Sequence, residues 1–488
     1  MRGVQRADGS FFSDTYTEVE LVRCALWCLQ KFSGTQHVYI GLRDAAMLLF
    51  STTTAVHGGS SRILRWSDLF MSEIPMDDVR LGKKVPVSCG TDGCDNLNLS
   101  RLCSQVLAAL ADNAKHNQQG RVDEHGTLRH RIVELCSVGA LARLFFAYFH
   151  IMKKPTPNFI PDFTKSGYGK YGHRDWYDYH VFAGKEDVKS KMSYDSKFQA
   201  EIVCASHGTY SCPSDHHKRI TIMHKENNVE ITKATHAGRC YGAKNSRAHG
   251  ATVGGTKALG GWNENGSFRN CYDRAFPVDA LLGAASFNAR KPEEYFLARD
   301  ELRECLMIQP FNITLLTILP WAGPPADVLA YLFPWVEAEL AALEVRMSQS
   351  RLNRDIALKQ FLRLLQWLRI VLVQDCALLY ARYPACPMFR FAPFTYPGFT
   401  TFSANAAALV IAAEEDARLA FHNLPDHMAR SMRGYATDLQ MKQEQNHSRV
   451  CEQLLELQQQ TARLELLLGN SKGSKRKTNG MFFLIKPS

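Results

Sequence analysis

The chain has 488 residues, of which 45% are hydrophobic and 22% are charged, a composition that argues against a disordered chain and indicates several folded domains. Its 58 Lys and Arg residues exceed its 48 Asp and Glu residues, and the formal net charge of +10 favours a polyanionic partner without requiring one. The N-terminus lacks the apolar core of a secretory signal. Residues 307–322 and 361–380 are apolar, but prolines or charges interrupt both, so we expect no membrane span and an intracellular protein with reduced cysteines.

The first part of the chain is expected to be helical, because apolar residues recur near helical spacing from residue 12 to about residue 135. Residues 82–98 lose this pattern and accumulate glycine and cysteine, which indicates a loop or an insertion, and the regular pattern returns at residues 99–110. The polar residues 115–121 include a glycine and suit the tip of a β-hairpin. Residues 138–150 then predict a buried helix.

The second half combines a basic, glycine-rich region with long helices. Residues 236–286 predict short helical pieces, and residues 236–274 contain six Lys and Arg against two acidic residues. Residues 328–379 predict long amphipathic helices. A short coiled coil is predicted from heptad positions, with a helix packed on its own domain as the alternative. Those heptad positions hold Val450, Leu454, Leu457, Thr461, Leu464 and Leu468.

The most informative motif is the pair His236-x-x-Arg239, followed by Trp262 twenty-six positions after His236 and by Tyr272 ten positions later. A tyrosine hydroxyl can cleave a DNA strand and store the phosphodiester energy as a phosphotyrosine. The transition state carries extra negative charge, which cations and hydrogen-bond donors must stabilise. The combination of these residue types at this spacing is far less common by chance than the H-x-x-R pair alone.

This motif resembles the catalytic motif of the tyrosine recombinases, whose early half is similar to residues 54–57 and 64–69. The resemblance becomes more specific when the sequences of four further segments are included, residues 41–46, 115–121, 135–141 and 259–263. It is similar to the fungal Crypton-type recombinases and to the second domain of the kinetochore's large centromere-DNA-binding subunit. The similarity covers roughly residues 39–296.

The resemblance implies a mainly α domain with a small β-hairpin, which binds duplex DNA largely through its phosphates. It implies that Tyr272 is the nucleophile, that Arg239, His236 and Trp262 bind the phosphate, and that Lys115 protonates the leaving oxygen. His57, however, occupies the position of the family's early arginine. Imidazole is mostly neutral at pH 7 and lacks the two-pronged guanidinium, so strand cleavage is in doubt.

We therefore expect a nuclear, transposon-derived protein that binds double-stranded DNA without cutting it, and an active recombinase is the alternative. The expected phosphate contacts are Arg239, Lys244, Arg247, Lys257, Arg269 and Lys115. No cofactor or metal is expected. A zinc site is weighed as a third reading, although its two pairs lie too close together for an ordinary zinc finger. Its ligands would be Cys204, His207, Cys212 and His216.

The domain organisation follows from these patterns, and self-association through the coiled coil is expected to be possible. Segments near residues 80–101, 197–214 and 306–318 depart from the family pattern, and we hypothesise that some are retained introns. The expected parts are a short helical remnant (1–35), a recombinase-like DNA-binding domain (36–300), a linker or insertion (301–325), a helical domain (326–435), a coiled-coil segment (436–470) and a basic tail (471–488).

Overall fold

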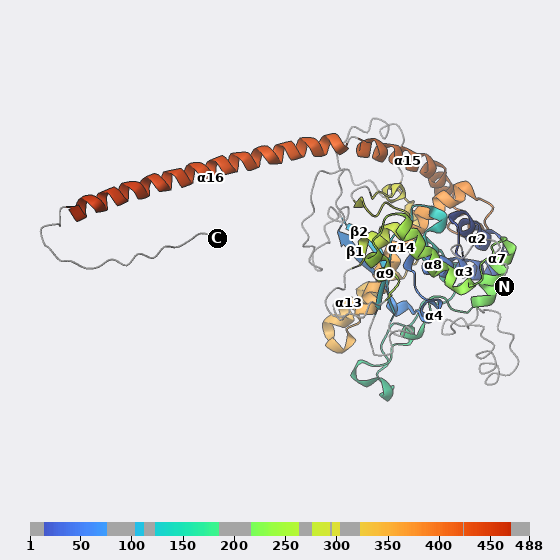
Figure 1. The fold of residues 1–488 in the computed structure, drawn as a ribbon. Coiled ribbons are helices and arrows are strands. Elements are labelled where there is room, and N and C mark those ends of the chain that lie inside the picture. The colour runs from blue at the N-terminus through green and yellow to red at the C-terminus, as the bar shows by residue number, and fades with distance from the viewer. Residues whose placement is uncertain are drawn as a thin grey trace. The chain divides into compact units, whose positions relative to one another are not determined.

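The computed structural model describes residues 14–75, 103–111, 123–184, 216–262, 276–292, 295–302, 323–422 and 424–469. The chain divides into two compact units, Met1–Ala417 and Arg418–Ser488. Within the described residues of the first unit, helices surround one small antiparallel sheet (Figure 1). This confirms the predicted fold class. The three departing segments named above lie outside the described residues.

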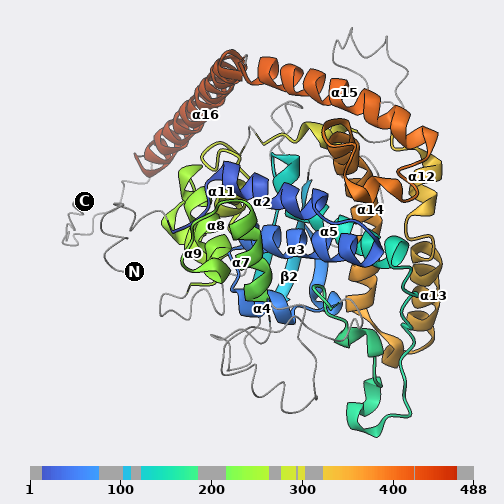
Figure 2. The ribbon, with the colours of Figure 1, turned by 90° about the vertical axis from the view of Figure 1, so that its right-hand side faces the viewer.

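The N-terminal helices form as the apolar periodicity predicts. Helix α2 (Glu18–Gln30) begins at a capping box, in which Thr17 and Glu20 exchange side-chain and backbone hydrogen bonds. Helix α3 (Thr35–Thr54) is buried along most of its length, as expected for a helix that is apolar on several faces. It packs against both α5 and α8 and lies between them in Figure 2. Helix α4 (Gly58–Ile63) follows.

The sheet occupies sequence that was expected to be helical. Its strands are β1 (Leu69–Pro75), β2 (Cys103–Ala111) and β3 (Asp123–Thr127), paired antiparallel in that order. A hairpin tip was predicted at residues 115–121, but the helical periodicity read over the residues of β1 and β2 was wrong, because β2 is a short apolar run whose periodicity does not distinguish a buried strand from a helix. Residues 112–122 join β2 to β3, as the predicted hairpin requires, but they lie outside the described residues.

Two buried helices hold the core together. Helix α5 (Ser137–Phe146) continues as a π-turn through Ile151, close to the predicted bounds of 138–150. Helix α14 (Ile356–Arg382) packs against α5 and β1. Phe361 of α14 stacks on the buried ring of Trp66 with 5.5 Å between ring centroids. By length and composition α14 could cross a membrane, but 72% of its most apolar window is buried inside the structure, where it serves as a core helix.

Residues of the helices between positions 328 and 410 share this core with the preceding part of the chain. The boundary expected near residue 325 therefore does not separate two cores, because the apolar face of α14 is covered by α5 and the sheet.

The remaining helices are α7 (His216–Glu226), α8 (Ala237–Ala248), α9 (Val253–Leu259), α11 (Val278–Ala284), α12 (Ala326–Tyr331), α13 (Val336–Gln349), α15 (Pro397–His422) and α16 (Leu424–Gly469). Short turns of helix are η1 (Trp66–Asp68), η3 (Val133–Leu135), η4 (Ala147–Ile151), η5 (Ser166–Tyr171), η6 (Asp175–Asp178), η7 (Ala234–His236), η9 (Ala298–Glu301), η10 (Arg351–Asn353) and η11 (Pro387–Arg390).

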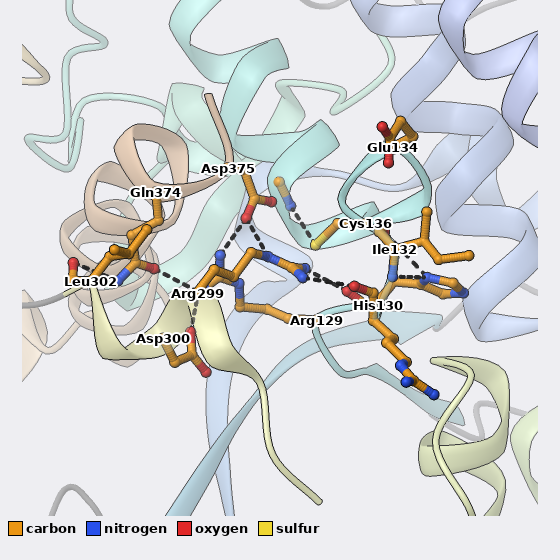
Figure 3. A network of polar contacts seen from close by, with 12 residues as sticks. Arg129, His130, Ile132, Glu134, Cys136, Arg299, Asp300, Leu302, Gln374 and Asp375 are labelled. Atoms are coloured by element: carbon orange, nitrogen blue, oxygen red, sulfur yellow. Dashed lines mark hydrogen bonds and ion pairs between the residues drawn. The ribbon is translucent and has the colours of Figure 1, made fainter. Parts of the chain in front are cut away.

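A buried polar network connects α14 to the segments around Arg129 and Arg299 (Figure 3). The Asp375 carboxylate is 0% exposed and accepts hydrogen bonds from Arg129 and, at 2.7 Å, from Nε of Arg299. Arg129 also donates to Asp300 and, at 2.6 Å, to Gln374. Burial alone would raise the pKa of Asp375, but the charges of Arg129 and Arg299 outweigh burial and keep that pKa below its ordinary value.

We predict that Asp375→Asn lowers the free energy of unfolding by about 3–5 kcal/mol, because it leaves buried guanidinium groups without their carboxylate. Denaturant unfolding followed by circular dichroism measures the change. Glu339→Gln is the control, since Glu339 pairs with Arg346 at 2.7 Å where both side chains are partly exposed, and its loss should cost less than about 1 kcal/mol. Equal losses in the two variants would contradict a special role for Asp375.

Candidate functional site

Helix α8 carries the H-x-x-R motif and lies directly against α3. The residues facing α3 are small: a side-chain carbon added at Gly242 would lie 2.1 Å from the backbone oxygen of Thr52. Glycine at this position therefore permits the close packing of the two helices. The opposite side of α8 exposes Lys244 and Arg247.

The loop before α8 is fixed by residues from the start of the chain. The Asp14 carboxylate accepts two hydrogen bonds from Thr232, one from the backbone nitrogen and one from the hydroxyl, each 2.6 Å long. The Thr15 hydroxyl donates to the backbone oxygen of Ala237 at 3.2 Å. The Tyr16 hydroxyl lies 2.6 Å from Nε2 of His224 in a buried hydrogen bond. We call residues 14–16 the N-terminal strap, because they form hydrogen bonds with residues on both sides of His236, the residue that precedes α8.

His236 is the N-cap of α8, and its ring is exposed. His57, the N-cap of α4, packs edge-on against it with 4.8 Å between ring centroids. The two histidines come from segments about 180 residues apart in sequence, and the contact of α3 with α8 brings them together. The structure thus places the predicted substitute for the early arginine at the H-x-x-R motif.

Arg239 lies one turn after His236 and is held from two sides. Its Nη2 donates to the backbone oxygen of Gly260 at 2.9 Å, and its guanidinium carbon lies 4.2 Å from the ring centroid of Trp262. Burial lowers the pKa of Arg239, but an arginine remains charged at neutral pH. The contact with Trp262 is a cation–π interaction, and it orients a guanidinium that has further N–H groups to donate.

Four of the six predicted catalytic residues therefore lie at one place, as two contacting pairs connected through the first turn of α8. The pairs are His57 with His236 and Arg239 with Trp262. Tyr272, Lys115 and Arg269 lie outside the described residues. The structure consequently leaves the predicted nucleophile and the predicted proton donor untested.

The surface around these pairs is basic. Residues 232–262 contain no Asp or Glu, and they include Lys233, Lys244, Arg247 and Lys257. Lys257 is partly exposed on α9, whose first turn is capped by Thr252. The nearby carboxylate of Asp279 in α11 accepts hydrogen bonds from the nitrogen and hydroxyl of Thr252, at 2.8 and 2.7 Å. A basic surface of this kind attracts polyanions.

Two residues near the site were not predicted to belong to it. Arg62 of α4 donates through Nη1 to Nδ1 of His216, 3.3 Å away. His216 is buried, and burial followed by the charge of Arg62 lowers its pKa to about 3. His216 was considered only as a zinc ligand, whereas here its Nδ1 binds an arginine. The other three proposed zinc ligands lie outside the described residues. Nothing in the spacing of Arg62 and His216 could have indicated their contact.

Comparison with known proteins identifies the family. Residues 29–400 match the family described as "Centromere DNA-binding protein complex CBF3 subunit, domain 2". No curated protein matches the chain. The match extends from the end of α2 into α15, so it includes the site and most of the core that supports it. Because it covers well over half of the sequence, the chain belongs to the family of the second domain of the centromere DNA-binding protein complex CBF3 subunit.

Proposed function

We propose that this protein binds double-stranded DNA in the nucleus through the basic surface around α8, without cleaving it. The observation that carries the proposal is the Arg239 guanidinium, which contacts Gly260 and Trp262 in a stretch, residues 232–262, that contains no Asp or Glu. Arginine suits phosphate recognition because its planar fork can donate two parallel hydrogen bonds. The family description, a centromere DNA-binding complex subunit, supports DNA as the polyanion.

The proposed contacts are to the phosphate backbone rather than to base edges. Lys244 and Arg247 are exposed on the same helix as Arg239, and lysine and arginine side chains of this kind release counterions when they neutralise phosphates. Such contacts hold a protein on DNA without reading its sequence. Lys257, together with Arg269 and Lys115 beyond the described residues, completes the proposed set of contacts.

Arg239→Ala should weaken duplex binding by about tenfold or more, because it removes a charge-assisted hydrogen bond to phosphate. The slope of log Kd against log salt should fall by about one phosphate contact. Arg239→Lys should give an intermediate loss, since it keeps the charge without the fork. Fluorescence anisotropy with a labelled duplex at several salt concentrations measures both quantities.

The control for that experiment is Arg351→Ala, which removes an exposed arginine of η10. It should leave affinity and salt slope nearly unchanged. If Arg239→Ala behaved like this control, the site would not be the one that binds DNA. If the unaltered protein failed to bind any duplex at low salt, the proposed function itself would be wrong.

An active tyrosine recombinase is the second candidate, supported by the contacts among His57, His236, Arg239 and Trp262. In that case Tyr272 would attack a phosphodiester and release the 5′-hydroxyl. We favour a transposon-derived protein that has lost cleavage, because His57 is an imidazole where the recombinase motif has a guanidinium.

A nicked suicide DNA substrate distinguishes the two candidates, since it traps a covalent protein–DNA adduct if cleavage occurs. We expect no adduct with the unaltered protein on denaturing gels, and the same result with Tyr272→Phe. An adduct that forms with the unaltered protein and disappears in Tyr272→Phe would establish the recombinase and overturn binding without cleavage.

We further propose that two copies associate through α16, to form a parallel coiled coil. The helix has 46 residues, and Val450, Leu454 and Leu457 are exposed at heptad spacing. Helices in proteins gain most of their stability from the packing of an apolar face, and a second copy of the same helix would cover this stripe.

Leu457→Glu should shift the full chain from dimer towards monomer in sedimentation equilibrium, because it places a charge in the heptad seam. Leu455→Glu is the matched control: Leu455 is equally exposed, 60% against 58% for Leu457, but lies off the seam. A monomeric unaltered protein, or equal effects of the two substitutions, would refute this mode of association.

A further inference from the structure

One surface loop of the first unit exposes three aromatic rings. Residues 160–173, which we call the aromatic loop, include Phe163, Tyr168 and Tyr171, and these residues are 52%, 55% and 51% exposed. Among the residues whose side chains the structure describes, no other aromatic residue is exposed to this extent. Each ring carries a large apolar area, and apolar side chains that gather on a surface mark interaction sites. The aromatic loop is therefore a candidate binding surface.

The backbone of the aromatic loop is fixed at its base. Asp162 and His173 pair as antiparallel residues through two backbone hydrogen bonds, each 2.8 Å long. The Asp162 carboxylate also accepts hydrogen bonds from the nitrogen and the hydroxyl of Thr164, at 2.9 and 2.6 Å. Gly172 has a φ of +69°, and a side-chain carbon added there would lie 2.9 Å from the ring of Phe163. A loop that is already ordered loses less conformational entropy when it binds a partner.

The residues that follow the aromatic loop attach it to the start of α14. Arg174 forms an ion pair with the Asp355 carboxylate at 2.9 Å, and both side chains are almost fully buried. Arg174 also donates to the backbone oxygen of Tyr171 at 2.6 Å. The hydroxyl of Tyr177 donates to Asp355 at 2.9 Å. In Figure 2 the blue-green loop projects from the helices at the bottom of the view, so its rings are held on a supported projection.

The charges of the aromatic loop indicate the kind of partner. Lys165 and Lys170 are exposed beside the rings: Nζ of Lys165 lies 3.1 Å from Nδ1 of His173, and Nζ of Lys170 lies 5.2 Å from the ring centroid of Tyr171. Asp162 is the one acidic residue of the loop. Protein-binding surfaces are enriched in aromatic residues but depleted in lysine. Surfaces that bind single-stranded nucleic acid combine positive charge with rings on which bases stack.

We propose that the aromatic loop binds single-stranded DNA, with Tyr168 and Tyr171 stacked on bases and with Lys165 and Lys170 at the phosphates. Bases in a duplex are already stacked on their neighbours, and a protein must separate them at a cost before a ring reaches their faces. Unpaired bases offer their faces without that cost. The family description supports DNA as the strand. This binding goes beyond the duplex binding proposed for α8 and does not depend on it.

The test measures the affinity of the full chain for a labelled oligothymidine strand by fluorescence anisotropy at several salt concentrations. Tyr168→Ala and Tyr171→Ala should each weaken binding by about tenfold with little change in salt slope, because each removes a stacking platform and no charge. Tyr168→Phe and Tyr171→Phe keep the ring and should bind like the unaltered protein. Lys170→Ala should instead reduce the slope of log Kd against log salt by about 0.7. Thermal unfolding of each variant separates loss of binding from loss of fold.

Ile160→Ala is the matched control, because Ile160 lies in the same loop and is 60% exposed but has no ring. It should bind the strand like the unaltered protein, and a loss equal to that of the tyrosine variants would overturn the proposal in favour of a general apolar docking surface. A strand of the same length with abasic residues keeps the phosphates and should bind about tenfold more weakly. Equal binding of the thymidine and abasic strands by the unaltered protein would also overturn stacking.

Arg239→Ala distinguishes this surface from the site on α8. It should weaken duplex binding, as proposed above, and leave the affinity for the thymidine strand unchanged. If Arg239→Ala weakens binding of the strand while Tyr168→Ala and Tyr171→Ala do not, the strand binds at α8, the role of the aromatic loop is refuted and the proposed function stands. If the tyrosine variants lose strand binding and Arg239→Ala leaves duplex binding intact, the aromatic-loop proposal holds and the proposed site on α8 fails.

Discussion

The fold depends on one carboxylate that water does not reach. Asp375 lies in the middle of α14 and accepts hydrogen bonds from arginines that are distant in sequence, Arg129 beside the sheet and Arg299 in the turn before residue 302. The removal of these charges from water is costly, and only their mutual pairing compensates for it. The network therefore fixes how α14 lies against α5 and β1, and α5 in turn packs on α3, the helix that supports the candidate site.

The candidate site contrasts with this core in the partners that hold Arg239, which are an aromatic ring and a backbone oxygen. In the core, Arg129 and Arg299 meet carboxylates directly, and their charges are used to hold helices together. Residues 232–262, which include Arg239, contain no acidic residue, and such a local excess of positive charge favours binding of a polyanion. The same residue type thus serves two purposes, and its partner determines which.

The sequence was informative where local pattern determines structure. Helical periodicity located α3, α5 and α14, and motif spacing identified His236, Arg239 and Trp262, which the fold brings together. The pattern failed for β2, since a buried apolar strand and a buried helix look alike over nine residues, and it could not reveal that α14 shares the core of the first unit. The contact between Arg62 and His216 was beyond reach for a different reason: it depends on long-range packing of α4 against α7, which no spacing in the sequence encodes.

The N-terminal strap has a consequence for what counts as the domain. Family similarity begins at residue 29, yet Asp14, Thr15 and Tyr16 bind Thr232, Ala237 and His224 around the start of α8. The unit that is recognisable by descent is therefore shorter than the unit that folds. A fragment cut at the family boundary would retain every motif residue and lose the hydrogen bonds that tether the loop carrying His236. The candidate site residues lie within the family match, while hydrogen bonds from residues outside the match hold the loop that carries them.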